Sequence, residues 1–253
     1  MTMHPSIWEQ EVRVNAYECD FNLAWKPASF FQHLTEIAGV HATQLGFGFQ
    51  AMQEMNYFWV LSRMKIQFHA FPRAGELIRI RTWPKTIQQK LFFIRDFEVQ
   101  TLSGEPLASA SSAWLVINTE TRRMVPSATL NLALPNLPDR CALTEFLEKI
   151  VIPPETEERL RACASYSTVD VQGHVNNSRY VEWICDSFEM ETFKQQRPAW
   201  MQVNYNTEVL PGEQISLRST VSSEQTDQWL LEGVNLTSGA RAFEAQIKWQ
   251  QFE

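Results

Sequence analysis

The sequence lacks a long hydrophobic run, and its N-terminus lacks the features of a targeting signal. No segment approaches the apolar length that a helix needs to cross a bilayer. The first residues, M-T-M-H-P-S-I-W-E-Q, have neither the basic start nor the apolar core of a secretory signal. These absences predict a protein of the cytoplasm without a membrane span.

Patterns that bind cofactors are also missing. The four cysteines have no metal-ligand or redox spacing, and the five histidines do not cluster with acidic residues at metal-ligand spacing. No glycine-rich phosphate loop occurs. We therefore expect no metal and no organic cofactor. Cys163 and Cys185 lie among apolar residues, and we interpret both as small buried hydrophobic residues.

Positive charge is scarce in the chain as a whole. The formal net charge of -7 argues against general nucleic-acid binding, which favours a basic surface. One stretch nevertheless holds eight cations among few acids: Arg63, Lys65, Arg73, Arg79, Arg81, Lys85, Lys90 and Arg95. On a single face these cations would steer an acidic partner. The alternative is that they scatter over strand edges and solvated faces.

The composition itself is that of a folded protein with a sizeable core. The chain has 253 residues, of which 44% are hydrophobic and 20% charged, a balance that excludes a disordered chain. The 16 Phe and 9 Trp suit deep apolar packing or an apolar ligand tunnel, and core packing is the more common role.

The chain contains two copies of one plan. When the two halves are aligned with a constant offset, Asp20 aligns with Asp170 and Asn22 with Gln172. In each copy a strand leads into a polar turn that contains these residues, and a helix follows the turn. Strand-like runs follow each helix. In the first half they are 57–71, 76–86, 91–102 and 107–118, and in the second half 201–209, 214–222, 228–236 and 240–249. We predict an α+β fold in which a curled antiparallel sheet wraps around one long central helix, twice.

A proline-rich segment separates the two copies and sets the predicted domain boundaries. The segment between Pro126 and Pro154 is rich in proline and carries an amphipathic piece around residues 143–150. We interpret it as a crossing linker. The predicted domains are therefore residues 1–125 and 156–253, joined by a linker over residues 126–155. In the first domain, one helix face is formed by Phe30, Phe31, Leu34, Ile37, Ala38 and His41, and Gly46 and Gly48 are expected to end that helix.

The most informative stretch is Y-S-T-V-D-V-Q-G-H-V-N-N-S-R-Y-V-E-W, residues 166–183. It crowds a carboxylate, carboxamides and an imidazole into a short turn at the entrance to an amphipathic helix, where backbone N–H groups are available to an oxyanion. Few helix caps need so many different polar groups. The stretch predicts an active site, in which Asn176 and Asn177 cap the helix and nearby backbone N–H groups form the oxyanion hole.

Several motifs, taken in order, resemble one family: the acyl-acyl-carrier-protein thioesterases of plant plastids and their bacterial relatives. The motifs are W-V-L-S-R-M (59–64), R-T-W (81–83), A-S-S-A-W-L-V-I-N-T-E-T-R-R (110–123), D-V-Q-G-H-V-N-N-S-R-Y (170–180) and N-Y-N-T-E (204–208). The resemblance covers nearly the whole chain. It implies a tandem, or double, hotdog fold and a role in fatty acid biosynthesis. The implied reaction is hydrolysis of fatty acyl-acyl carrier protein to free fatty acid.

The resemblance also implies the catalytic residues. They are Asp170, Gln172 and His174 of the turn and Glu208 on a following strand. Gln172 stands where the family has asparagine, so its amide reaches one methylene further. Val209 stands where some members have a cysteine, which excludes a cysteine nucleophile here. Glu208 would activate water or attack directly, and partial burial near an acyl tunnel would raise its pKa toward the useful range.

For each of these residues a structural role is the alternative. His174 could cap the helix, Asp170 could only stabilise the turn, and Glu208 could be an exposed strand glutamate. The equivalent turn in the first half has Ala24 at the place of His174, so only the second copy is expected to be catalytic.

Other functions remain possible on the same fold. They are an acyl-coenzyme A thioesterase and a fatty-acyl-binding protein without turnover. A dehydratase of the same fold fits the motifs less well. The expected partner is acyl carrier protein with its phosphopantetheine-linked acyl chain, and both a monomer and a homodimer are compatible with the sequence.

Overall fold

The computed structural model describes residues 5–130, 132–223 and 225–252. Contacts divide the chain into two compact units, and each is described by itself. Unit 1 contains residues up to 25 together with 33–147, and unit 2 contains residues 26–32 together with those from 148 onward. Among the helices described, none is long and apolar enough to cross a membrane.

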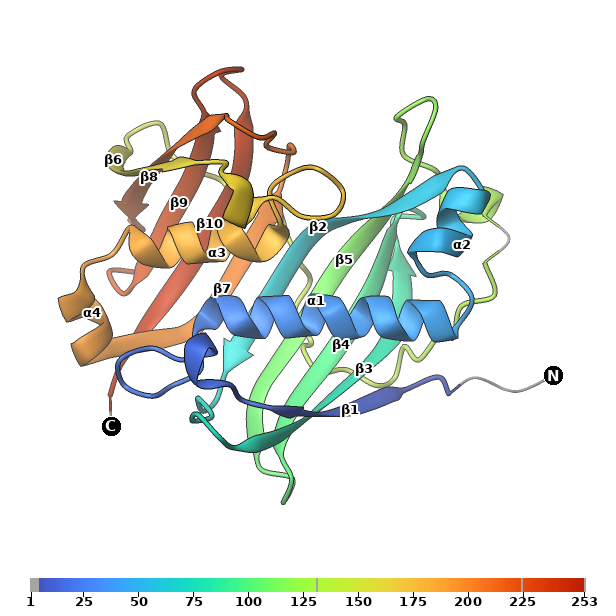
Figure 1. Ribbon diagram of the computed structural model, residues 1–253, viewed down its shortest axis with the longest axis horizontal. Coiled ribbons are helices and arrows are strands. Elements are labelled where there is room, and N and C mark those ends of the chain that lie inside the picture. The colour runs from blue at the N-terminus through green and yellow to red at the C-terminus, as the bar shows by residue number, and fades with distance from the viewer. Residues whose placement is uncertain (1–4, 131, 224, 253) are drawn as a thin grey trace. The chain divides into compact units, whose positions relative to one another are not determined.

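Unit 1 is built on an antiparallel sheet with strand order β1-β3-β4-β5-β2 (Figure 1). Its elements are β1 (Trp8–Arg13), the 3-10 turn η1 (Ala16–Glu18), α1 (Pro27–Gln44), α2 (Phe49–Glu54), β2 (Tyr57–Phe68), β3 (Leu77–Gln88), β4 (Phe92–Thr101), β5 (Pro106–Asn118) and the 3-10 turn η2 (Ser127–Thr129). The first residues of α1 group with unit 2. The predicted helix face is buried, since Phe30, Leu34 and Ile37 are at most 3% exposed.

Unit 2 repeats this arrangement with strand order β7-β10-β9-β8-β6 (Figure 1). Its elements are β6 (Glu157–Cys163), the 3-10 turn η3 (Tyr166–Thr168), α3 (Asn177–Asp186), α4 (Met190–Gln195), β7 (Gln196–Tyr205), β8 (Gln214–Val221), β9 (Gln228–Asn235) and β10 (Arg241–Gln251). The first strand in sequence lies at one edge and the second at the other in both units. The predicted duplication is confirmed, and the fold is a double hotdog.

The strands that follow each helix lie where the sequence predicts them, and the differences are local. β7 begins at Gln196, five residues before the predicted start at Met201. Gly46, with φ of +84°, follows the end of α1 as predicted, whereas Gly48 is the N-cap of α2. The short helices α2 and α4 were not predicted because six residues are too few to establish a helical period.

The cysteine prediction is wrong for Cys163, which is exposed. The cause is its place on β6, the edge strand of unit 2, whose residues are mostly exposed. Cys185 on α3 is partly buried, and burial raises the pKa of its thiol to about 12. All four cysteines are free thiols.

The part of the predicted linker that belongs to unit 1 is an extended strap held by a buried carboxylate. Asp96 on β4 is 0% exposed. Its Oδ2 accepts from the backbone N–H of Ala142 at 2.8 Å and pairs with Lys85 Nζ at 3.0 Å, while Oδ1 accepts from the Ser111 hydroxyl at 2.7 Å. Asp96 therefore ties β3, β5 and the strap to β4. Leu143 and Leu147 of the amphipathic piece are buried, in backbone that is neither helix nor strand.

We expect Asp96→Ala to lower the free energy of unfolding by about 3 to 5 kcal/mol, because it leaves Lys85, whose side chain is 11% exposed, without its counter-charge. Asp227→Ala is the matched control, since Asp227 pairs with Lys248 at 3.3 Å on an exposed site and should cost less than about 1 kcal/mol. Urea unfolding of both variants measures the difference. Equal losses would show that Asp96 does not anchor the strap.

A second buried polar contact seats α1 on the sheet of unit 1. His41 is 0% exposed, its Nδ1 accepts from Arg95 Nη1 on β4 at 3.0 Å, and its Nε2 lies 2.9 Å from the carbonyl of Pro5. Burial lowers the pKa of His41 to about 4, with the charge of Arg95 acting in the same direction. The imidazole is therefore neutral in the folded protein near pH 7.

This contact predicts acid sensitivity. The unfolded chain takes up a proton on His41 near pH 6.5 and the folded chain only near pH 4, so between these values the unfolded state binds more protons. The contribution of His41 is complete above pH 6.5 and is lost by up to about 3 kcal/mol as the pH falls to 4. The difference in unfolding free energy between wild type and His41→Gln should shrink over this window. A constant difference from pH 7 to pH 4 would contradict the assignment.

Candidate active site

The turn from Val169 to Val175 is organised by Asp170. Its backbone N–H donates to the carbonyl of His174 at 2.9 Å, and its carboxylate Oδ1 accepts from the N–H of Gln172 at 2.9 Å. Gly173 donates to the Asp170 carbonyl at 3.0 Å with φ of +85°, a conformation that glycine adopts without strain. Asp170 thus makes the contacts expected of a residue that stabilises the turn, which is the structural alternative to a catalytic role.

The helix that follows begins as the sequence predicts at Asn176, with one correction. The Asn176 side chain caps α3 by accepting from the N–H of Ser178 at 3.0 Å, whereas Asn177 is already the first helical residue. The N–H groups of Gln172, Gly173 and Ser178 are engaged inside the turn. None of these three amides therefore supports the expected oxyanion hole.

His174 lies beside the Asp170 carboxylate, with 3.8 Å between Nδ1 and Oδ1. Both side chains are partly exposed, at 27% and 21%. Because Asn176 is the cap of α3, the alternative in which His174 caps the helix is wrong. The imidazole is accessible to a ligand. Gln172 is exposed, with its backbone fixed by Asp170.

Glu208 lies beyond the end of β7, and its side chain is exposed. The expectation of a partly buried strand glutamate is therefore wrong. The backbone still carries this residue to the turn, since the Val175 N–H donates to the carbonyl of Val209 at 2.9 Å. All four predicted site residues belong to unit 2, and two adjacent backbone segments present them.

Tyr180 on α3 is a residue of this region that the sequence analysis did not assign to the site. It is 3% exposed, and burial raises the pKa of its hydroxyl. The charges of Asp170 and Glu208 act in the same direction. One sequence signal was available, because a tyrosine on the buried face of a helix needs a partner for its hydroxyl.

The equivalent turn of unit 1 has the same backbone geometry. Asp20 N–H donates to the carbonyl of Ala24 at 2.8 Å, and its Oδ1 accepts from the N–H of Asn22 at 2.8 Å. Leu23 has φ of +61° where unit 2 has Gly173. The offset predicted from the sequence is therefore confirmed down to individual hydrogen bonds. Ala24 leaves this copy without the imidazole.

The basic stretch does not form a free positive face. Most of its cations have partners inside unit 1: Arg79 with Glu9 and Glu11, Arg81 with Glu9, Lys85 with Asp96, Lys65 with Glu145, Arg63 with the carbonyl of Leu147, and Arg95 with His41. Neighbouring acids neutralise several of these charges. The structure favours the alternative in which the cations scatter over the sheet.

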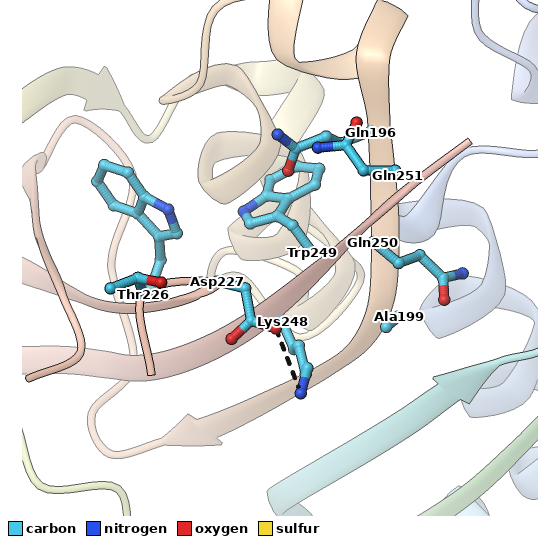
Figure 2. Close-up of a pocket in the computed structure, with 9 residues that line it drawn as sticks. Gln196, Ala199, Thr226, Asp227, Lys248, Trp249, Gln250 and Gln251 are labelled. Atoms are coloured by element: carbon cyan, nitrogen blue, oxygen red, sulfur yellow. Dashed lines mark ion pairs between the residues drawn. The ribbon is translucent and has the colours of Figure 1, made fainter. Parts of the chain in front are cut away.

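A surface depression of about 540 Å³ also lies in unit 2, and Figure 2 shows residues that line it, among them Gln196, Trp249 and Gln251. This depression lies at the start of β7. The turn from Val169 to Val175 instead contacts Val209, which lies beyond the end of that strand. The two sites are thus separated by the length of β7, about 30 Å at the usual rise of a strand. Within the described residues, no cluster of three or more His, Cys, Asp or Glu could hold a metal ion.

Comparison with known proteins identifies the family. Residues 5–129 match the acyl-ACP thioesterase N-terminal domain, and residues 153–251 match the acyl-ACP thioesterase C-terminal domain. The two matches cover most of the chain. The protein therefore belongs to the acyl-ACP thioesterase family.

Relatives agree with this assignment. The chain is 26% identical over 264 residues to the chloroplastic palmitoyl-acyl carrier protein thioesterase of Gossypium hirsutum, covering 96% of this chain and 64% of the relative. It is 28% identical over 218 residues to the enzyme of the same name from Arabidopsis thaliana, covering 80% of this chain and 52% of the relative. The chain thus spans between half and two thirds of these plant proteins.

Solved structures share the fold. An acyl-ACP thioesterase from Bacteroides thetaiotaomicron matches with a TM-score of 0.80 and 27% identity, over 97% of this chain and 98% of the other. The 12:0-ACP thioesterase from Umbellularia californica matches with a TM-score of 0.82 and 20% identity over 100% of both chains. The second likeness shows the fold alone.

Proposed function

We propose that this protein hydrolyses the thioester of fatty acyl-acyl carrier protein and releases free fatty acid. The observation that carries the proposal is that both halves match this thioesterase family while only the second turn keeps an imidazole, close to the Asp170 carboxylate and to the segment of Glu208. Water adds to the thioester carbonyl, the C–S bond breaks, and the thiol leaves on the phosphopantetheine arm.

Each residue of the turn has a proposed role. Glu208 takes a proton from the attacking water as general base. His174 orients that water or donates a proton to the leaving thiolate. Gln172 holds the water or the carbonyl through its amide, and Asp170 fixes the turn. The exposure of Glu208 suits this scheme only if bound substrate excludes solvent, because desolvation is what raises the pKa of a carboxyl toward neutral pH.

The proposal also includes the shape of the sheets, the position of the acyl tunnel, the cellular location and the oligomeric state. We propose that each sheet curls around its helix and that the buried face of α1, with Phe30, Phe31 and Leu34, borders the acyl tunnel. A cytoplasmic location, with the four cysteines as free thiols, belongs to the proposal, as does a monomer or homodimer.

The test is thiol release across acyl-carrier-protein thioesters of increasing chain length, with the matching coenzyme A series in parallel. Turnover with a preference for carrier-protein substrates supports the proposal. A preference for coenzyme A thioesters would change the proposed substrate to acyl-coenzyme A. Acyl binding without turnover would instead make the protein a fatty-acyl-binding protein.

We expect Glu208→Gln to lower kcat by about 100-fold or more, because loss of a general base costs this much in other enzymes. Glu189→Gln is the matched control, since Glu189 is also exposed but lies at the N-cap of α4. Steady-state thiol release measures both variants. Near-normal turnover in Glu208→Gln would remove Glu208 from the mechanism.

Gln172→Asn is expected to retain or increase kcat. The shorter side chain keeps the amide, and the backbone of residue 172 stays held by Asp170. Gln172→Ala should lose activity, because it removes the amide itself. If kcat collapses in Gln172→Asn, the turn uses the longer reach of glutamine, and the role taken from the family is wrong for this chain.

A further inference from the structure

Tyr205, the last residue of β7, carries a buried polar group without a partner. The residue is partly exposed, but its hydroxyl oxygen is buried and has no hydrogen-bond partner among the described residues. Nearly all buried polar groups in folded proteins are paired, because an unpaired one costs folding free energy. The Tyr205 hydroxyl therefore points to a partner from outside the chain.

This hydroxyl belongs to the inner face of the sheet of unit 2. Side chains alternate along a strand, so Tyr205 lies on the same face as Met201 and Val203, which are both 0% exposed. The ring centroid of Tyr205 lies 5.9 Å from that of Tyr180 on α3. Tyr205 thus points from the sheet toward the helix that follows the predicted catalytic turn.

Two short connections place Tyr205 close to the predicted site. Tyr180, which its ring contacts, lies four residues after the N-cap Asn176, about 6 Å along a helix axis. In the other direction, Tyr205 lies three residues before Glu208, a span of at most about 11 Å. The next residue, Val209, accepts a hydrogen bond from the turn at 2.9 Å. Tyr205 is therefore near both segments that present the predicted site residues.

The proposed reaction needs a hydrogen-bond donor that the turn does not supply. When water adds to a thioester carbonyl, negative charge develops on the carbonyl oxygen, and donors aimed at that oxygen make a large contribution to catalysis. The N–H groups of Gln172, Gly173 and Ser178 are engaged inside the turn. A tyrosine hydroxyl can take the place of a backbone amide in this role.

We propose that the Tyr205 hydroxyl donates a hydrogen bond to the thioester carbonyl oxygen of the bound substrate. This inference rests on the proposed function. Water adds to the carbonyl carbon, and the carbonyl electron pair moves onto the oxygen, where Tyr205 stabilises it without giving up its proton. When that pair returns, the C–S bond breaks and the thiol leaves with a proton.

The hydroxyl remains a donor throughout the neutral pH range. Burial raises the pKa of Tyr205 above its usual value, and the neighbouring Tyr180 acts in the same direction. Tyr205 therefore keeps its proton while the charge develops on the substrate oxygen.

The substitution Tyr205→Phe separates a role in substrate binding from a role in folding. Because the hydroxyl is unpaired in the free protein, its loss should leave Tm unchanged or raise it. In the same variant, kcat for acyl-carrier-protein thioesters should fall about 100-fold or more, the usual effect of losing an oxyanion donor. A lower Tm would show that the hydroxyl has a partner inside the protein, and a near-normal kcat would show that it does not contact the carbonyl. Either result would overturn the proposal.

Tyr57 supplies a matched control in unit 1. It lies at the start of β2, where it packs against the buried cluster of Met52, Phe93 and Val116. Tyr57→Phe removes the same group from a different sheet and should keep kcat within about twofold of wild type. Equal losses of kcat in the two variants would contradict a specific role for Tyr205.

Two unreactive ligands separate this inference from the proposed function. One is an acyl-pantetheine amide, in which nitrogen replaces the thioester sulfur and the carbonyl remains. The other is an alkyl-pantetheine thioether of the same chain length, in which a methylene replaces the carbonyl. Isothermal titration calorimetry gives the ratio of their affinities. Tyr205→Phe should reduce the preference for the amide about 3- to 10-fold, the usual effect of one neutral hydrogen bond.

This binding readout requires no turnover. A protein that releases no thiol but loses its preference for the amide in Tyr205→Phe would refute the thioesterase proposal and keep the carbonyl contact. An unchanged affinity ratio would refute the contact itself, whatever the wild-type activity.

Discussion

The turn that starts at Asp170 depends on a carboxylate and a backbone amide that together close a short loop. The N–H of Asp170 reaches the carbonyl of His174, and the carboxylate holds the N–H of Gln172. This closure directs the chain into α3, which the Asn176 side chain caps. The segment after β7 then meets the turn at Val209, whose carbonyl accepts from the N–H of Val175. The proposed chemistry uses side chains at the surface of this assembly.

Several residues of the family motifs lie in unit 1 and hold the strap. Arg63 donates to the carbonyl of Leu147, and the Trp83 indole donates to the carbonyl of Arg140 at 3.0 Å. Ser111 donates to the Asp96 carboxylate, which also accepts from the strap backbone. These motif residues have structural contacts in unit 1, while the predicted site residues lie in unit 2. A motif shared with a family of enzymes can therefore reflect the need to pair buried polar groups.

Sequence patterns predicted the structure correctly where the signal was local and repeated. The constant offset between the halves predicted the duplicated turn, and the structure repeats it in the paired hydrogen bonds of Asp20 and Asp170. Alternation predicted the strands because their side chains point to opposite faces. Sequence patterns gave wrong predictions where the outcome depended on neighbours distant in sequence. Cys163 is exposed because β6 is an edge strand, and most cations of the basic stretch have partners in unit 1. The domain limits at residues 125 and 156 stay predictions.

The sequence by itself determined the duplicated plan, the strands, the start of α3 and the residue types gathered in the second turn, because periodicity, caps and turn chemistry are properties of adjacent residues. Only the tertiary structure decided that Glu208 is exposed and that Val209 bonds to the turn. These contacts join segments that are far apart along the chain. Their geometry depends on how the helix packs against its sheet, and no local pattern encodes that packing.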